Sequence, residues 1–232
     1  MLKIRSEQKE IIDNLGYNNP TLIENLKDME KINHWLGFNK ALSRALKKIK
    51  NRFPKEKISL ADLGCGSGDS LRYLYHWARS NQIALELHGI DANQFIIEYA
   101  KSASLSYPTI QYHYQNIFLS TANYDILTLN NICHHFTNDE LINLLKKLKT
   151  QIRCALIIND LHRHLCAYWG FYCIAKFLRL SEITKHDGAL SVKRGFTRVE
   201  LINILHKAGI EDYQLRWDWM FRWQIIILKQ SV

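Results

Sequence analysis

The residues in this sequence that could most directly do chemistry are Asp62 and the glycines that follow at every second position, Gly64, Gly66 and Gly68. They belong to, or directly follow, the apolar run 58–63, which predicts a buried strand. Glycine lets the backbone turn sharply and approach a ligand with no Cβ in the way. Apolar residues at helical spacing after the turn predict a helix, whose first N–H groups point at the turn. This order of elements is typical of a nucleotide-type ligand site in a doubly wound α/β sheet.

The spacing of the glycines distinguishes between ligands. A dinucleotide-binding G-x-G-x-x-G fingerprint requires glycine at position 69, where the sequence has Asp69. The pattern is instead D-x-G-x-G-x-G, and its first carboxylate, Asp62, favours an amino-acid ammonium group over a pyrophosphate. A purely structural glycine turn is the alternative, but such a turn does not require Asp62.

The stretch from Asp62 to Gly68 resembles the first motif of the class I S-adenosylmethionine-dependent methyltransferases. The resemblance implies that S-adenosylmethionine is the methyl donor and that S-adenosylhomocysteine is the product. The loop residues that it implies for donor binding are Asp62, Gly64, Cys65, Gly66 and Gly68.

The second predicted strand ends at Asp91, 23 residues after Gly68. A carboxylate at the end of this strand can accept hydrogen bonds from both hydroxyls of a ribose. The alternative is that Asp91 only caps the helix predicted over 93–103. Together with the glycine loop the ribose role is favoured, and it places Ala92 beside the adenosine.

Two further strand ends contribute to the donor site that the resemblance implies. After the strand predicted over 109–114, the family usually places an acidic residue against the adenine amine, whereas this sequence has Asn116, followed by Ile117. An asparagine oxygen can still accept that hydrogen bond. After the strand 124–130, the sequence resembles the fourth motif of small-molecule methyltransferases. We therefore expect Asn130 and Asn131 to contact the donor and His135 to contact the acceptor.

Polar side chains are dense after the strand predicted over 153–159 and in the later segment 185–196, which we interpret as a loop over the cleft. A hydroxyl acceptor needs a base to remove its proton, and histidine is suited to this near neutral pH. The predicted catalytic residues are His162, His186 and Asp187. The residues predicted to hold an anionic part of the substrate are Arg163 and Arg194.

The expected fold is a Rossmann-like α/β fold with a seven-stranded, mostly parallel sheet. A C-terminal antiparallel hairpin completes the sheet, and helices cover both faces. We divide the chain into an N-terminal helical cap, 1–54, and a methyltransferase domain, 55–232, with an apolar helical and loop insertion at about 163–196. Residues 53–55 are the predicted hinge. The apolar helix 165–178 is too short to span a bilayer; we expect it to pack internally, with contact to a membrane surface as the alternative.

Within the superfamily, the segments 32–37, 159–163 and 185–196 resemble a bacterial branch of small-molecule O-methyltransferases associated with secondary metabolites. This resemblance implies methyl transfer to an apolar or aromatic small molecule, most simply at a hydroxyl oxygen. It does not specify the acceptor or the oligomeric state.

Charge and cysteine content narrow the range of partners and compartments that the sequence allows. The formal net charge of +9 permits an anionic partner, but the sequence after the fourth strand lacks the Asn-Pro-Pro-aromatic stretch of enzymes that methylate bases. A nucleic-acid substrate is therefore disfavoured. Five scattered cysteines without a C-x-x-C pair, and an N-terminus without a long apolar core, predict free thiols in the cytoplasm.

Two other functions remain open from the sequence. A carbon methyltransferase for quinone-like substrates would use the same cleft, and a binding module would keep the fold without turnover. A metal-dependent mechanism is disfavoured, because no tight set of carboxylates occurs at ligand spacing, and we predict no metal.

Overall fold

The computed structural model describes residues 2–16, 18–53 and 57–229. Its α-helices are α1 (Pro20–Trp35), α2 (Phe38–Ile49), α3 (Asp69–Ser80), α4 (Gln94–Ala103), α5 (Asn138–Gln151), α6 (Leu165–Phe177), α7 (Glu182–Arg194) and α8 (Arg198–Lys207). Its strands are β1 (Ile58–Leu63), β2 (Leu85–Asp91), β3 (Ile110–Tyr114), β4 (Tyr124–Asn130), β5 (Ile152–Leu161), β6 (Tyr213–Asp218) and β7 (Arg222–Leu228). The short 3-10 helices are η1 (Ile11–Asp13), η2 (Lys50–Arg52) and η3 (Cys133–His135).

The seven strands form one sheet in the order β3-β2-β1-β4-β5-β7-β6. Strands β1 to β5 pair in parallel, and β7 runs antiparallel to both β5 and β6. The order reverses at β1, between β2 and β4, so the ends of these strands form the topological switch point at which α/β proteins bind ligands. The predicted fold class is confirmed.

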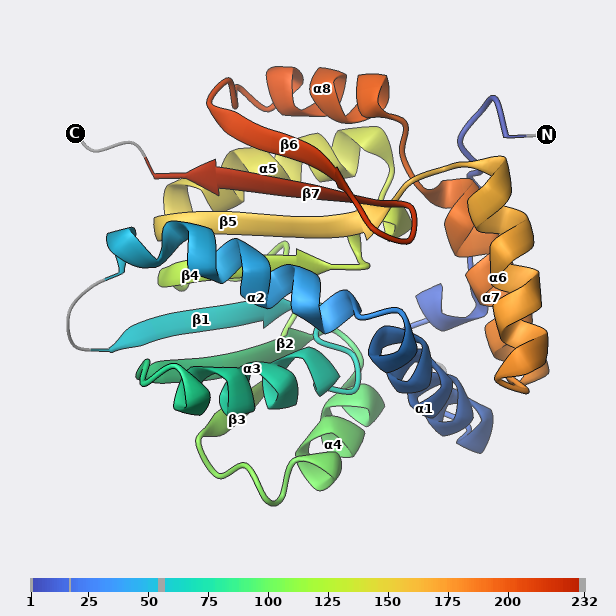
Figure 1. The fold of residues 1–232 in the computed structure, drawn as a ribbon, viewed down its shortest axis with the longest axis horizontal. Coiled ribbons are helices and arrows are strands. Elements are labelled where there is room, and N and C mark those ends of the chain that lie inside the picture. The colour runs from blue at the N-terminus through green and yellow to red at the C-terminus, as the bar shows by residue number, and fades with distance from the viewer. Residues whose placement is uncertain (1, 17, 54–56, 230–232) are drawn as a thin grey trace.

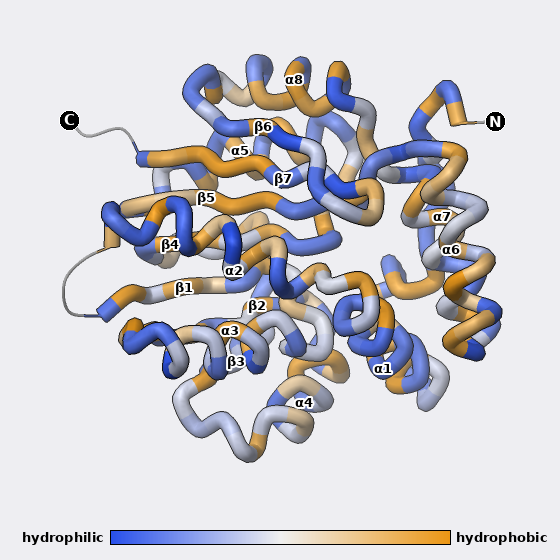
Figure 2. The backbone as a smooth tube through the Cα atoms, in the orientation of Figure 1, coloured by the Kyte–Doolittle hydropathy of each residue, from blue (hydrophilic) through white to orange (hydrophobic). Residues whose placement is uncertain are grey.

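Helices cover both faces of the sheet because the central strands carry apolar side chains on both faces. On one face, α2, α3 and α4 bury leucine, isoleucine and alanine side chains against β1 and its neighbours. On the other face, α5 and α8 pack against β4, β5 and β7. Figure 2 shows the central strands as predominantly hydrophobic. This rigid sheet holds the loops at its carboxyl edge in fixed positions.

Three helices lie beyond the carboxyl edge of the parallel strands, where β1 and β5 end (Figure 1). Helix α1 comes from the N-terminal region, and α6 with α7 from the segment after β5. Helix α6 packs on α7 with one side, while Trp169 and Phe177 on its other side are 60% and 71% exposed. In the described part of the chain, no helix has the length and apolarity to cross a lipid bilayer.

The segment interpreted as a loop over the cleft is instead helix α7. Ser181 caps it, its side chain accepting a hydrogen bond from the N–H of Thr184. Gly188, which suggested a turn, lies inside the helix, where an added Cβ would be 2.2 Å from the ring of Phe171. The glycine therefore permits close packing of α6 on α7. Helix α1 is capped by Asn19, whose side chain accepts a hydrogen bond from the N–H of Thr21. Of the predicted hinge, residues 54 and 55 lie outside the described residues.

Two glycines in this pair of helices offer a matched test of that packing. Gly188→Ala is expected to lower the free energy of unfolding by about 1–3 kcal/mol, because the new methyl group collides with Phe171. Gly170→Ala in α6 meets open space among the described atoms and is expected to be neutral, or stabilising by up to about 1 kcal/mol. Urea denaturation measures both. Equal effects of the two substitutions would contradict the packing role of Gly188.

Candidate functional site

A cavity of about 940 Å³ opens at the carboxyl edge of the sheet. Its walls come from the glycine loop, the ends of β2 and β4, η3, and helices α1, α6 and α7, together with the N-terminal segment 5–15. A volume of this size accommodates a small ligand pair. The cavity therefore joins the predicted donor site to a second compartment under the three outer helices.

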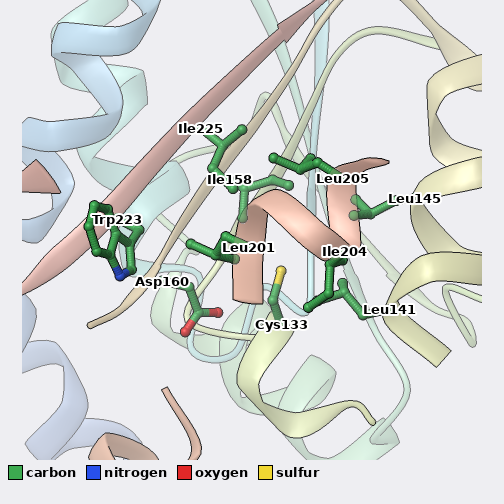
Figure 3. Close-up of a pocket in the computed structure, with 10 residues that line it drawn as sticks. All are labelled: Cys133, Leu141, Leu145, Ile158, Asp160, Leu201, Ile204, Leu205, Trp223 and Ile225. Atoms are coloured by element: carbon green, nitrogen blue, oxygen red, sulfur yellow. The ribbon is translucent and has the colours of Figure 1, made fainter. Parts of the chain in front are cut away.

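A second space lies inside the core between α5, α8, β5 and β7 (Figure 3). Its volume is about 10 Å³, at the lower limit for one water molecule. Its lining is apolar except for Asp160, whose carboxylate is bonded to His134 and Leu161. This space is a packing gap, so ligand binding belongs to the large cavity.

The glycine loop has the conformation that its sequence requires. Gly64, Gly66 and Gly68 all have positive φ angles, of 71°, 52° and 77°. An added Cβ would lie 1.9 Å from Ile132 at Gly64 and 2.1 Å from the Tyr112 hydroxyl at Gly68. At Gly66 it would meet no described atom within 4 Å, because this glycine faces the cavity. The backbone of the loop is thus open to a ligand at its midpoint and packed at both ends.

Asp62 lies at the inner end of the loop and is 2% exposed. Its Oδ1 accepts hydrogen bonds from Thr128 Oγ1 at 2.7 Å and Asn130 Nδ2 at 2.8 Å. Burial raises the pKa of Asp62 to about 7, although these two donors favour the ionised form. A cationic group bound beside this carboxylate would keep it ionised, as the ammonium group of an amino acid does.

Asp91 closes the other side of the loop. Its Oδ2 accepts from the Gly66 N–H at 3.1 Å and its Oδ1 from the Asn93 N–H at 3.0 Å. Asn93, not Asp91, caps α4 by accepting from the N–H groups of Phe95 and Ile96. Since each carboxylate oxygen has a second lone pair, Asp91 can still receive two hydroxyl groups from the cavity.

The other residues predicted to bind the donor lie around the same space. Asn116 Oδ1 accepts from the Phe118 N–H at 2.9 Å, which fixes its orientation. Asn131 has a φ of 53°, and its Oδ1 accepts a hydrogen bond from Arg222. The predicted donor-binding residues that line the cavity are Asp62, Gly64, Cys65, Gly66, Asp91, Ala92, Asn116, Ile117, Asn130 and Asn131. Gly68 does not line it; its N–H donates to the Cys65 carbonyl at 2.9 Å and supports the turn.

The N-terminal helices are bonded to the loop. Asp69 Oδ2 accepts from the side-chain amides of Asn33 and Asn39, both at 3.0 Å. Arg72 binds Glu30 at 2.7 Å and the Ser67 carbonyl at 2.7 Å. These bonds hold α1 across the cavity as its outer wall.

Two neighbouring histidines of η3 enter the cavity wall, each held by a carboxylate. His134 is buried, and its Nδ1 lies 2.7 Å from Asp160 Oδ1. The charge of His134 and its hydrogen bonds lower the pKa of Asp160 to about 2 despite complete burial. His135 Nδ1 makes a short hydrogen bond with Asp13, whose pKa is lowered by this bond and by Arg194. Both carboxylates are therefore acceptors, and each imidazole presents its Nε2 to the other side.

That other side holds Glu10. Its Oε1 is 3.7 Å from His134 Nε2, and its Oε2 is 3.9 Å from His135 Nε2. Burial raises the pKa of Glu10 to about 7. Among the described residues, Oε1 has no hydrogen-bond partner. Glu10 and the two imidazoles are referred to below as the Glu10 cluster.

The two predicted bases lie elsewhere. The cavity walls formed by the described residues do not include His162 or His186. His162 packs against Trp223, because its backbone continues the pairing of β5 with the end of β7. His186 is bonded to Asp187 at 2.8 Å, as expected, but Asp187 also accepts from the N–H groups of Ile11 and Ile12. Asp187 lines the cavity and anchors η1 rather than serving a base that faces an acceptor.

The two predicted substrate-binding arginines are occupied by structural bonds. Arg163 is 4% exposed and donates to the Leu2 and Gly195 carbonyls and to Glu200. Arg194 donates to the His134 and His135 carbonyls and to Asp13. Arg194 touches the cavity and positions the two histidines, whereas Arg163 lies outside the lining.

The site also contains residues that the sequence analysis missed. These are Arg5, Glu10, Asp13 and Asp160, which bond to or face η3. The first three belong to a segment without apolar periodicity, so no local signal marked them. Asp160 was visible as a carboxylate at a strand end, next to the histidine that was chosen instead.

Comparison with known proteins identifies the type of domain. Residues 60–153 match the family model described as a methyltransferase domain. No curated protein sequence matches the chain. Over these residues the family match confirms the predicted methyltransferase domain.

Solved structures share the fold. A candidate O-methyltransferase from Nostoc punctiforme is 18% identical with a TM-score of 0.65, over 95% of this chain and 64% of that one. The chain thus spans less than two thirds of that protein. The plantazolicin methyltransferase, in complex with a pentazolic analogue and S-adenosylhomocysteine, is 17% identical with a TM-score of 0.66, over 91% of both chains. Magnesium protoporphyrin IX methyltransferase from Synechocystis is 14% identical with a TM-score of 0.56, over 84% of both chains.

Proposed function

We propose that this chain, with its methyltransferase domain over residues 60–153, transfers the methyl group of S-adenosylmethionine to a hydroxyl oxygen of a small, largely apolar acceptor. The observation that supports this proposal most strongly is the shared cavity. It joins the glycine loop to a cluster of imidazole and carboxylate groups under α1, α6 and α7.

The residues of the loop fit the donor. Asp62 is a buried carboxylate suited to an ammonium group, and Asp91 offers two oxygens to a ribose. Gly66 leaves the backbone open between them. The donor supplies a methyl group on a sulfonium, which is already reactive, so the protein mainly has to align the acceptor and exclude water.

The acceptor compartment fits an apolar molecule with a hydroxyl group. Its walls include Leu26, Met29, Ile32, Phe171 and Ile174. The imidazole of His135 is partly open to the cavity, and Asp13 fixes its Nδ1 proton so that Nε2 can accept another. In this proposal His135 replaces His162 and His186 as the histidine base. Methyl transfer to carbon in a quinone-like acceptor would use the same compartment.

The relatives give the proposal a substrate class. One is a magnesium protoporphyrin IX methyltransferase and another is in complex with a pentazolic analogue, and both of these are extended aromatic molecules. We therefore infer an aromatic acceptor for this chain. We place the reaction in the cytoplasm, since the five cysteines are free thiols.

A panel of phenols and aliphatic alcohols tests the proposal. Incubated with S-adenosylmethionine and the purified protein, at least one aromatic hydroxyl compound is expected to yield S-adenosylhomocysteine and a methyl ether, both measured by mass spectrometry. His135→Asn is expected to lower kcat by about 10²–10⁴-fold. His186→Asn, outside the cavity, serves as the control and should retain activity. Equal turnover in the two variants would contradict the base role, and a carbon-methylated product would contradict the proposed acceptor atom.

A further inference from the structure

The Glu10 cluster brings together three side chains that can each offer a ligand atom. The Nδ1 atoms of the two histidines are hydrogen-bonded to Asp160 and Asp13, so both Nε2 atoms are turned away from these carboxylates. The Nε2 atoms face the carboxylate of Glu10 across 3.7 and 3.9 Å. Those distances are too long for hydrogen bonds.

The neighbouring cation, Arg194, does not supply the hydrogen bond that Glu10 lacks. Arg194 Nη1 is 3.8 Å from Glu10 Oε1, again beyond a hydrogen bond, and this nitrogen donates to Asp13. Glu10 Oε1 has no hydrogen-bond partner among the residues that the structure describes, although the side chain is only 3% exposed. A buried carboxylate oxygen without a hydrogen-bond partner is costly unless a cation lies beside it.

The spacing is that of ligands around one ion. The three ligand atoms all lie within 4.8 Å of one another. Two atoms each about 2.1 Å from a metal ion are separated by about 3–4 Å, depending on the angle. The bonds from each imidazole to a carboxylate are also those that metal-bound histidines make, because they fix the tautomer and orient the ring.

We propose that Glu10, His134 and His135 bind a divalent transition-metal ion. Two imidazoles and one carboxylate suit ions from manganese to zinc, and are too poor in oxygen ligands for calcium or magnesium. Three protein ligands leave at least one coordination position open, and the cluster lines the acceptor compartment.

This position gives the ion a role that rests on the proposed function. A hydroxyl bound to it has a lowered pKa and loses its proton to solvent. In the following step the acceptor oxygen forms its bond to the methyl carbon while the carbon–sulfur bond of the sulfonium breaks. With the ion bound, His135 acts on the acceptor hydroxyl through the ion; without the ion, it is the base proposed above.

Calorimetric titration of the full-length protein, first treated with a chelator and then dialysed, tests the site with Zn²⁺ and Co²⁺ as probes. The expected result is one ion per chain, with affinity at least 10-fold weaker in Glu10→Gln and in His135→Asn. His186→Asn is the matched control, since this half-exposed histidine is outside the cluster and should bind the ion as the unsubstituted protein does. Cobalt absorption bands that shift in His135→Asn would identify imidazole as a ligand.

The proposal is overturned if binding is not saturable, or if Glu10→Gln and His135→Asn bind as tightly as the control. Circular dichroism of both variants excludes loss of the fold as the cause of weaker binding. Titration of the same metal-free protein with S-adenosylhomocysteine separates the two proposals. If the donor product binds and the ion does not, only the metal site fails; if the ion binds and the donor product does not, only the methyltransferase assignment of the cavity fails.

Discussion

Asp91→Ala is expected to weaken the binding of S-adenosylhomocysteine by at least about 100-fold. Each hydrogen bond from a ribose hydroxyl to a buried carboxylate contributes about 1.5–3 kcal/mol, and two are lost. The substitution also frees the N–H groups of Gly66 and Asn93, which Asp91 now holds at 3.1 and 3.0 Å. Isothermal titration calorimetry with the donor and its product measures the change.

The control for this prediction lies seven residues further along the chain. Glu98 is exposed on α4, and Glu98→Ala should bind the donor normally. Thermal denaturation of Asp91→Ala shows whether the glycine loop has unfolded rather than lost its ligand contacts. Unchanged affinity in a folded Asp91→Ala protein would show that Asp91 does not bind the ribose.

Asp160→Asn is expected to lower the free energy of unfolding by about 3 kcal/mol. Asp160 is 1% exposed and accepts hydrogen bonds from His134 and from the Leu161 N–H, and Arg222 adds a favourable charge. Removing one member of such a buried charged network leaves the others without their partner. Urea denaturation at pH 7 measures the loss, with the exposed Asp212→Asn as the control.

The same carboxylate predicts how stability depends on pH. Its pKa of about 2 in the folded protein lies below the ordinary value of 3.8, so its contribution is complete above about pH 4. That contribution, about 2 kcal/mol, is lost as the pH falls from 4 towards 2. Over this pH range, the free energy of unfolding should therefore change less with pH in Asp160→Asn than in the unsubstituted protein. An equal change in both proteins would contradict the lowered pKa of Asp160.

Much of the fold and of the donor site could be predicted from the sequence, because the signals for them are local. The capping box of Thr137 with Glu140 and that of Thr197 with Glu200 mark helix starts within four residues, and both are present. The positive φ angles of the glycine loop follow from residue type alone. Strand β4 has the predicted bounds for the same reason, since its five central residues are all buried and most of them are apolar.

The residues of the acceptor compartment could not be predicted from local signals. Glu10 meets His135 across 125 positions of sequence, and no spacing rule joins residues so far apart. The position of His162 outside the cavity could not be predicted either, because the packing of the elements around the end of β5 decides which side chains reach the cavity. Helix α7 was missed because a glycine that permits helix packing looks the same in sequence as one that makes a turn.

The bonds that tie α1 to the glycine loop have a consequence for how the two substrates influence each other. Asp69 begins the helix after the loop and holds Asn33 and Asn39, while Arg72 bonds both the loop carbonyl of Ser67 and Glu30. A donor that orders the loop therefore also orders the wall of the acceptor compartment. Donor and acceptor should then bind with positive cooperativity, and by thermodynamic reciprocity each raises the affinity of the other by the same factor. Saturation with one of the two would then lower the apparent dissociation constant of the other.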